Sequence, residues 1–138
     1  VLSDLMWNAN VAAGDAKVLL LGWSYKAEVG DPRETPAEPL AETLMAKGIT
    51  VGAWDPHLDD GSYPEGVEVI SDISKAEGYD MAVLVTAHKA CLELDWSELV
   101  KQMRTPLIYD GRRVLNLEEL TSKGWKAYAV GRPYGDGL

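Results

Sequence analysis

Lys17-Val18-Leu19-Leu20-Leu21-Gly22 is the clearest indication of the fold in this sequence. Its apolar residues run without a polar break and end at a glycine, which is typical of a strand buried on both faces of a parallel sheet. Such a strand needs a helix layer on each face, so we expect helices and strands to alternate along the rest of the chain.

The segments that follow show this alternation. After a polar loop, Thr35 can cap a helix that has Pro36 in its first turn, and apolar residues recur at helical spacing as far as Met45. A basic residue and a glycine, Lys47-Gly48, end that helix. Further strands are predicted over 49–54, 67–70, 79–86, 107–109 and 125–130, and further helices over 73–77, 96–103 and 117–123.

This order predicts an α/β fold of the doubly wound, Rossmann-like type. Right-handed crossovers then give a mostly parallel sheet in a three-layer α/β/α arrangement, with strand order 3-2-1-4-5-6. Residues 15–138 form one domain, and residues 1–14 hold the end of a helix that enters from upstream sequence. Ligands of such sheets bind beyond the carboxyl ends of the strands, which here are the loops after Gly22, Thr86 and Tyr109.

Composition and charge exclude several classes of function. The chain has 138 residues, a formal net charge of -9 and a pI near 4.6, so we expect no nucleic-acid partner. The longest apolar run is far too short to span a bilayer, and no signal peptide opens the chain, which predicts a cytoplasmic protein without a membrane partner. One cysteine forms no internal disulfide. The histidines, His57 and His88, lie apart in the sequence, so we predict no metal site.

The first strand lacks the glycine fingerprint of a dinucleotide site. That fingerprint needs Gly-x-Gly-x-x-Gly to let the backbone approach a pyrophosphate, whereas Gly22-Trp23-Ser24-Tyr25-Lys26 carries side chains there. Asp55 follows the second strand where a ribose-binding acid would stand, but without the glycines we expect it to serve a turn or cap. The domain should not bind NAD in the usual crevice by itself.

Two cationic loops are the candidate ligand sites. The loop 25–36 carries Lys26 and Arg33 close to a helix start, and the turn after Tyr109 offers Arg112 and Arg113 at the same edge of the sheet. Cations in such places suit a phosphate or a carboxylate. Charges that pair among themselves in solvent would have the same composition, so the pattern alone leaves both interpretations open.

Neither of the reactive side chains at this edge is predicted to be catalytic. His88 follows the strand over 79–86 and could act as a general base, but a lone loop histidine more often caps a helix or lies at the surface. Cys91 stands between apolar residues and is expected in the core rather than as a nucleophile.

A long motif resembles a known family. Residues 22–36, Gly-Trp-Ser-Tyr-Lys-Ala-Glu-Val-Gly-Asp-Pro-Arg-Glu-Thr-Pro, look like the Gly-x-x-Phe/Tyr-Lys-x-Asp-x-x-Asp-x-Arg-Glu-Ser-Pro signature of the UDP-glucose/GDP-mannose dehydrogenases. Shorter matches follow in the family's order: Trp54-Asp55-Pro56, Thr86-Ala87-His88, Asp95-Trp96 and Asp110-Gly111-Arg112.

The resemblance implies a function. These enzymes oxidise the C6 alcohol of a nucleotide sugar to a carboxylate in two NAD-dependent steps, in nucleotide-sugar metabolism and polysaccharide biosynthesis. The chain would be their C-terminal, UDP-sugar-binding domain. Its partner would be the N-terminal domain of the same full-length protein, which would carry the catalytic cysteine and most of the NAD site. The fragment alone would be inactive, and the full-length protein would be a homo-oligomer.

The resemblance also assigns binding roles to four residues. Tyr25 and Lys26 match the aromatic-lysine pair that contacts the substrate, and Arg112 matches the substrate-binding arginine of the Asp-Gly-Arg turn. Arg33 matches the arginine that reaches the NAD held by the other domain. Tyr25 is typical of enzymes for UDP-N-acetylhexosamines and the Asp-Gly-Arg turn of UDP-glucose enzymes, so the sugar stays open.

Two other functions would fit the same scaffold. A stand-alone Rossmann-like module could bind or regulate a protein partner through its surface. A CoA-binding-like domain shares the fold but should have a different phosphate loop. Fold alone does not separate these functions, whereas the ordered motifs favour the dehydrogenase domain.

Overall fold

A computed structural model describes residues 16–24, 26–28 and 35–129 of the chain. Six strands form one sheet: β1 (Lys17–Leu21), β2 (Thr50–Trp54), β3 (Glu68–Val69), β4 (Met81–Leu84), β5 (Leu107–Asp110) and β6 (Lys126–Ala129). The helices are α2 (Ala37–Ala46), α3 (Lys89–Leu92), α4 (Trp96–Gln102) and α5 (Leu117–Ser122), with 3-10 turns η2 (Asp60–Ser62) and η3 (Ile73–Lys75). The helix predicted within residues 1–14 lies outside the described residues.

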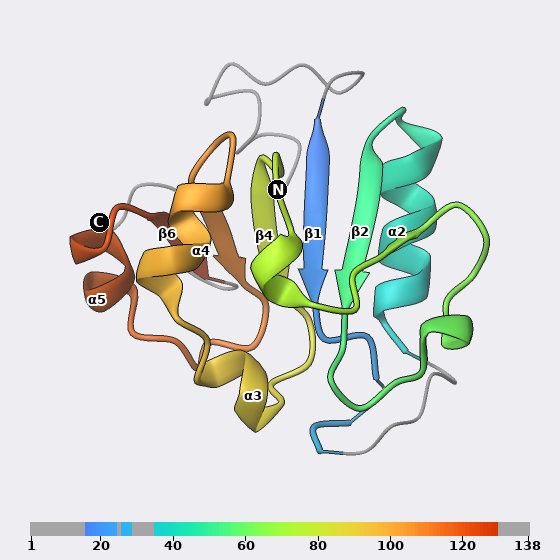
Figure 1. Ribbon diagram of the computed structural model, residues 1–138, viewed down its shortest axis with the longest axis horizontal. Helices are drawn as coiled ribbons and strands as arrows, with labels where there is room; N and C mark the ends of the chain where they lie inside the picture. Colours follow the sequence, from blue (N-terminus) through green and yellow to red (C-terminus); the bar gives the residue numbers. More distant parts are fainter. Residues whose placement is uncertain (1–15, 25, 29–34, 130–138) are drawn as a thin grey trace.

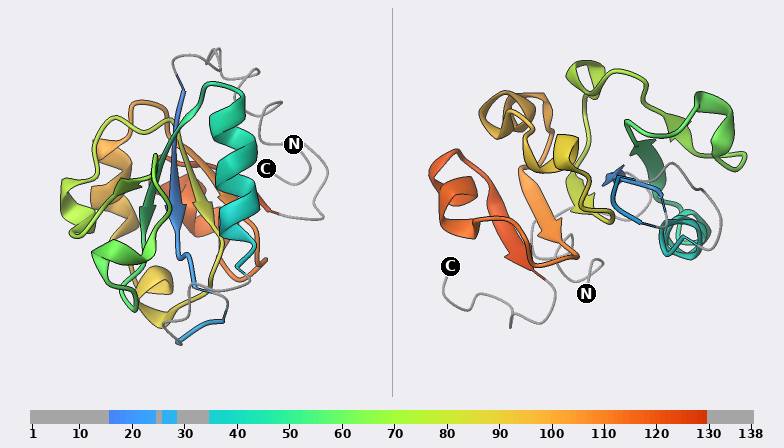
Figure 2. Two further views of the ribbon diagram at one scale, coloured as in Figure 1. Left: turned by 90° about the vertical axis from the view of Figure 1, so that its right-hand side faces the viewer. Right: turned by 90° about the horizontal axis from the view of Figure 1, so that it is seen from below.

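The sheet has the predicted order β3-β2-β1-β4-β5-β6, and every neighbouring pair of strands is parallel. Seen end-on, α2 lies on one side of the sheet, and α3, α4 and α5 lie on the other (Figure 2). The predicted α/β class, the three layers and the doubly wound topology are therefore confirmed.

Alternate side chains of the central strands point to opposite faces of the sheet and pack into two apolar layers. Val18 and Leu20 of β1 pack on the α2 side with Ala41 and Leu44, whereas Leu19 and Leu21 pack on the side of α4 and α5. All four β1 residues are 0% exposed. This burial on both faces is why the strand reads as one continuous apolar run in the sequence.

The Thr35 hydroxyl supports the beginning of α2 as expected, but Pro36 and not Thr35 stands at the N-cap position. The Thr35 hydroxyl accepts a hydrogen bond from the Ala37 amide at 3.1 Å and donates one to the Trp23 carbonyl. The helix start is thereby tied to the end of β1. The sequence analysis missed one helix, α3, because four residues are too few to show a periodic pattern.

At the edge of the sheet where the strands begin, a buried carboxylate joins neighbouring strands by hydrogen bonds. Asp80, which is 0% exposed, accepts hydrogen bonds from the Arg104 side chain, the Thr105 hydroxyl and the Lys17 amide. Burial alone would raise the pKa of Asp80, but the bonds from Arg104 and Thr105 hold it below the ordinary value. These contacts fasten the starts of β1, β4 and β5 together, which leaves the carboxyl edge for the functional loops.

Candidate functional site

The loops after β1, β2 and β4 meet at the carboxyl edge of the sheet, at the bottom of Figure 1. Asp55, the residue after β2, joins them. One of its carboxylate oxygens, Oδ2, accepts hydrogen bonds from the Trp23 and Ser24 amides at 2.7 and 2.8 Å and from the Ser24 hydroxyl at 2.7 Å. Its other oxygen accepts from the His57 amide at 2.8 Å. The predicted turn role of Asp55 is confirmed, and the same carboxylate also fixes the loop after β1.

Asp55 is ionised although it is buried. It is 4% exposed, and this burial alone would raise its pKa. The hydrogen bonds from the Trp23 and Ser24 amides act in the opposite direction and hold the pKa below its ordinary value. The loop is therefore organised around an internal negative charge.

This internal charge occupies the place where a dinucleotide fold binds phosphate. The backbone amides of Trp23 and Ser24, which directly follow Gly22, already donate to Asp55. The Trp23 side chain is 1% exposed and packs edge-to-face on Tyr63, with ring centroids 5.3 Å apart. The residues at the end of β1 therefore do not fit NAD in the usual crevice.

Gly22 allows the loop after β1 to lie against the loop after β4. Its φ is +85°, and a Cβ atom on it would stand 2.6 Å from the Thr86 carbonyl oxygen. The Thr86 hydroxyl in turn donates to the Ser24 carbonyl at 2.6 Å. Only a residue without a side chain permits this close backbone approach.

His88 stands at the N-cap position of α3, one of the two places expected for a lone loop histidine, but its side chain makes no capping hydrogen bond and is buried. Its ring is 0% exposed, and its Nε2 lies 2.9 Å from Asp55 Oδ2. Its Nδ1 accepts a hydrogen bond from the Glu28 amide at 2.8 Å. An amide can only donate, so Nδ1 carries the lone pair, and Nε2 carries the proton that points at Asp55.

Glu28 and His57 complete a polar cluster that the sequence analysis did not find. Glu28 Oε2 lies 2.8 Å from His57 Nε2 and 3.6 Å from His88 Nδ1. The two imidazole rings are 4.4 Å apart between centroids. Burial would raise the pKa of Glu28, but the hydrogen bond with His57 holds it below the ordinary value. These residues come from three separate loops, so no single stretch of sequence indicates that they lie together.

Asp110 builds the turn that carries the arginine pair. Its carboxylate is 0% exposed and accepts from the Arg112, Val114 and Leu115 amides at 2.7–2.9 Å. Gly111 passes so close to the end of β4 that a Cβ would stand 2.7 Å from the Leu84 carbonyl oxygen. The Asp-Gly-Arg motif is thus a folded turn in which the aspartate orients the backbone, as predicted.

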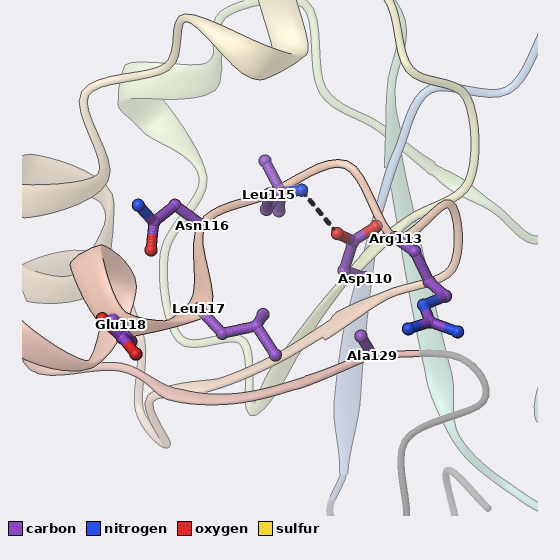
Figure 3. A pocket seen from close by; sticks show the side chains of 7 residues that line it. All are labelled: Asp110, Arg113, Leu115, Asn116, Leu117, Glu118 and Ala129. Carbon is purple, nitrogen blue, oxygen red and sulfur yellow. Dashed lines mark hydrogen bonds between the residues drawn. The ribbon is translucent and has the colours of Figure 1, made fainter. Parts of the chain in front are cut away.

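A pocket of about 290 Å³ opens beside this turn, beyond the carboxyl ends of β5 and β6. Asp110, Arg113, Leu115, Asn116, Leu117, Glu118 and Ala129 line it. Figure 3 shows the Arg113 guanidinium extending past Asp110 beside Ala129. Of the predicted arginine pair, Arg113 lines this pocket, whereas the resemblance to the family assigns substrate contact to Arg112.

The structure describes two of the predicted ligand-binding residues. Lys26 follows β1, Arg112 follows β5, and both are exposed. One strand, β4, separates β1 from β5, so the two loops start about 10 Å apart at the usual strand spacing. Tyr25 and Arg33 lie outside the described residues. Lys26 and Arg112 therefore follow strands that end at the same edge of the sheet.

Cys91 is a core residue, as the sequence analysis expects. Its thiol is 0% exposed, and burial, reinforced by the negative charge of Asp55, raises its pKa to about 12. A thiolate is the reactive form of cysteine, so this side chain is unsuited to act as a nucleophile.

Alkylation will test this assignment. At pH 8 a thiol with a pKa near 12 has about a thousandfold less thiolate than one at the reference value of 9.0. We expect the native chain to react with iodoacetamide at least that much more slowly than the urea-unfolded chain, as measured by mass spectrometry. Equal rates in both states would show that Cys91 is accessible and reactive.

Comparison with known proteins shows that the sequence of this chain matches a family. The UDP binding domain of the UDP-glucose/GDP-mannose dehydrogenase family is matched by residues 19–117. A UDP-glucose 6-dehydrogenase of Pseudomonas aeruginosa is 34% identical over 125 residues, which cover 84% of this chain and 28% of the relative. A UDP-N-acetyl-D-mannosamine dehydrogenase of Methanocaldococcus jannaschii is 29% identical over 119 residues, covering 83% of this chain and 27% of the relative.

The chain is also similar in structure to solved dehydrogenases. An NDP-N-acetyl-D-galactosaminuronic acid dehydrogenase from Methanosarcina mazei superposes with a TM-score of 0.83 at 27% identity, over 95% of this chain and 28% of its own. A UDP-D-ManNAc dehydrogenase from Pyrococcus horikoshii superposes with a TM-score of 0.74 at 26% identity, over 95% and 29% of the two chains.

The chain spans less than a third of the length of these relatives. Within residues 16–24, 26–28 and 35–129, no helix is long and apolar enough to cross a membrane. The matched region contains the loops at the carboxyl ends of β1, β2, β4 and β5, which are the parts that carry the motifs. The chain therefore belongs to the UDP-glucose/GDP-mannose dehydrogenase family, in the part of it described as the UDP binding domain.

Proposed function

We propose that this chain is the nucleotide-sugar-binding domain of an NAD-dependent nucleotide-sugar 6-dehydrogenase, which oxidises the C6 alcohol of its substrate to a carboxylate. The observation that carries the proposal is the family match over residues 19–117, which spans the loops at one edge of the sheet. Binding the nucleotide far from C6 would position the sugar for hydride transfer.

Lys26 and Arg112 would hold the pyrophosphate of the substrate from two sides. Both side chains are exposed, and they follow strands that are separated by β4 alone. Lysine acts as a compact charge, whereas the planar fork of arginine can bind two phosphate oxygens at once. Tyr25 would complete the substrate contacts, since it stands next to Lys26 in the matching motif.

NAD would be held mainly by an N-terminal domain of the same protein, and it would accept the hydride in each oxidation step. The end of β1 does not fit the dinucleotide, because Asp55 already uses the Trp23 and Ser24 amides. Arg33 would reach across to that cofactor. With Cys91 buried in the core, the chain would have no turnover by itself. The complete protein would be a homo-oligomer.

Calorimetric titration will test the nucleotide-sugar site. We expect the chain to bind a UDP-sugar, and Lys26→Ala and Arg112→Ala each to weaken this binding by about 10- to 150-fold. That range corresponds to the loss of one hydrogen-bonded charge, about 1.5–3 kcal/mol. UDP-glucose, UDP-N-acetylmannosamine and GDP-mannose should be compared, with NAD expected not to bind.

Two further variants make the titration decisive. Lys101→Ala removes an exposed cation of α4, which contacts Glu98 at 3.1 Å, and should leave the affinity unchanged. Arg113→Ala tests the pocket beside Asp110. A loss confined to Arg113→Ala would show that Arg112 is the wrong arginine. UDP-sugar binding that survives both Lys26→Ala and Arg112→Ala, or dehydrogenase activity of the chain alone, would contradict the proposal.

A further inference from the structure

Three metal-ligating atoms converge at the carboxyl edge of the sheet. Glu28, His57 and His88 each offer one potential ligand atom, and these three atoms all lie within 4.8 Å of one another. They come from the loops after β1, β2 and β4, which meet at the lower edge of Figure 1. We propose that Glu28, His57 and His88 bind a Zn²⁺ ion. The two histidines are the only ones in the sequence, and the fold brings them together although they lie far apart along it.

The separations of Glu28 Oε2 from the two histidine nitrogens are close to those that Zn²⁺ requires. Tetrahedral coordination with bonds of about 2.0–2.1 Å places neighbouring ligand atoms about 3.3–3.4 Å apart. Glu28 Oε2 is 2.8 Å from His57 Nε2 and 3.6 Å from His88 Nδ1, which lie on either side of that value. A metal ion between them would widen the first separation and shorten the second by a few tenths of an ångström.

His88 has the orientation and tautomer of a metal ligand. Its Nε2–H points at the buried Asp55 carboxylate at 2.9 Å, which leaves the lone pair on Nδ1 facing Glu28. Ligating histidines usually donate their other ring N–H to a carboxylate in this way. In the structure, the Glu28 amide donates to Nδ1, so Zn²⁺ would replace that amide. Glu28 has a φ of +63°, an unfavourable conformation for a residue with a side chain, and the exchange would let it relax.

The ligand set selects the type of metal. Two imidazoles and one carboxylate suit Zn²⁺ and leave a fourth position for water, whereas Mg²⁺ and Ca²⁺ prefer oxygen ligands. The charges of Glu28 and Asp55 together offset the +2 charge of the ion. The Glu28 and His57 side chains are 49% and 36% exposed, so an ion can enter from solvent. The site does not depend on the proposed nucleotide-sugar binding, and either proposal can fail alone.

Metal titration of the chain, stripped of metal with a chelator, tests the site. Calorimetry should show one Zn²⁺ per chain. Long-range ¹H–¹⁵N correlation spectra should show shifts at both imidazoles, at the Nε2 of His57 and at the Nδ1 of His88. We expect His57→Asn and Glu28→Gln each to weaken Zn²⁺ binding by about 100-fold or more, because the loss of even an outer-shell partner costs about 10- to 100-fold. Both positions are partly exposed, so these variants should fold.

Three results would overturn the proposal. Zn²⁺ binding of equal strength in His57→Asn and the unsubstituted chain would place the metal elsewhere. A shift of His57 without a shift of His88 would show a surface contact instead of a three-ligand site. Mg²⁺ that competes as well as Zn²⁺ would indicate attraction to the acidic surface only. The control Glu65→Gln removes an exposed acid that lies beyond η2, later in the connection between β2 and β3, and should leave the affinity unchanged.

Discussion

Replacing Asp55 with alanine will lower the free energy of unfolding by about 3–5 kcal/mol, the usual cost of breaking a buried ion or hydrogen-bond network by removing one partner. Without the carboxylate, the Trp23 and Ser24 amides and the Ser24 hydroxyl lose their acceptor at the end of β1. The Nε2–H of His88 also loses its partner inside the protein. Urea unfolding followed by tryptophan fluorescence will measure the change.

The matched control is Asp59→Ala, which removes an exposed aspartate four positions further along the same loop. It should change the free energy of unfolding by less than about 0.5 kcal/mol. A loss below about 1 kcal/mol for Asp55→Ala would show that solvent or other groups replace the carboxylate. The loop after β1 would then not depend on it.

The contribution of Asp55 to stability should depend on pH in one direction. Its pKa is lower in the folded chain than the reference value of 3.8. The contribution is therefore complete above that pH and is lost as the pH falls through the lower, folded pKa. The stability difference between the unsubstituted chain and Asp55→Ala should accordingly shrink below about pH 4. Comparison of the two proteins removes the similar effect of Asp80.

Substitution of Gly22 by alanine will lower the free energy of unfolding by about 3 kcal/mol. The left-handed backbone costs about 1–2 kcal/mol for a residue with a side chain, and forced overpacking costs about 1–3 kcal/mol more. Gly22 has a φ of +85°, and the added Cβ would meet Thr86 atoms at 2.6–2.9 Å. Two of those atoms belong to the backbone and cannot turn away. Urea unfolding will measure the loss.

Two other glycines separate these two costs. Gly78 has a φ of +76° but nothing within 4 Å of its added Cβ, so Gly78→Ala should lose about 1–2 kcal/mol from the backbone alone. Gly61 has open space as well and no positive φ, so Gly61→Ala should be neutral or stabilising by up to about 1 kcal/mol. Equal losses for Gly22→Ala and Gly78→Ala would mean that the close approach to Thr86 contributes nothing.

The candidate site divides into a part that the sequence predicts and a part that it does not. Lys26 and Arg112 could be named because each stands in a contiguous motif directly after a strand. Glu28, His57 and His88 could not be named as a cluster, because their contacts join three loops and depend on the register of β1, β2 and β4. Arg112 and Arg113 could be named as a cationic pair after β5, but only the folded turn shows that Arg113 lines the pocket beside Asp110.

The α/β class, the strand order and the absence of a glycine phosphate loop could all be predicted from the amino-acid sequence. These properties follow from local patterns: an apolar run where a strand is buried on both faces, helical spacing beside it, and glycines present or absent at fixed positions. Only the tertiary structure decided that Asp55 takes the amides a phosphate would need, and that Nδ1 of His88 faces Glu28. Hydrogen bonds between distant loops require atoms placed to within a few tenths of an ångström, and only the packed sheet fixes them so closely.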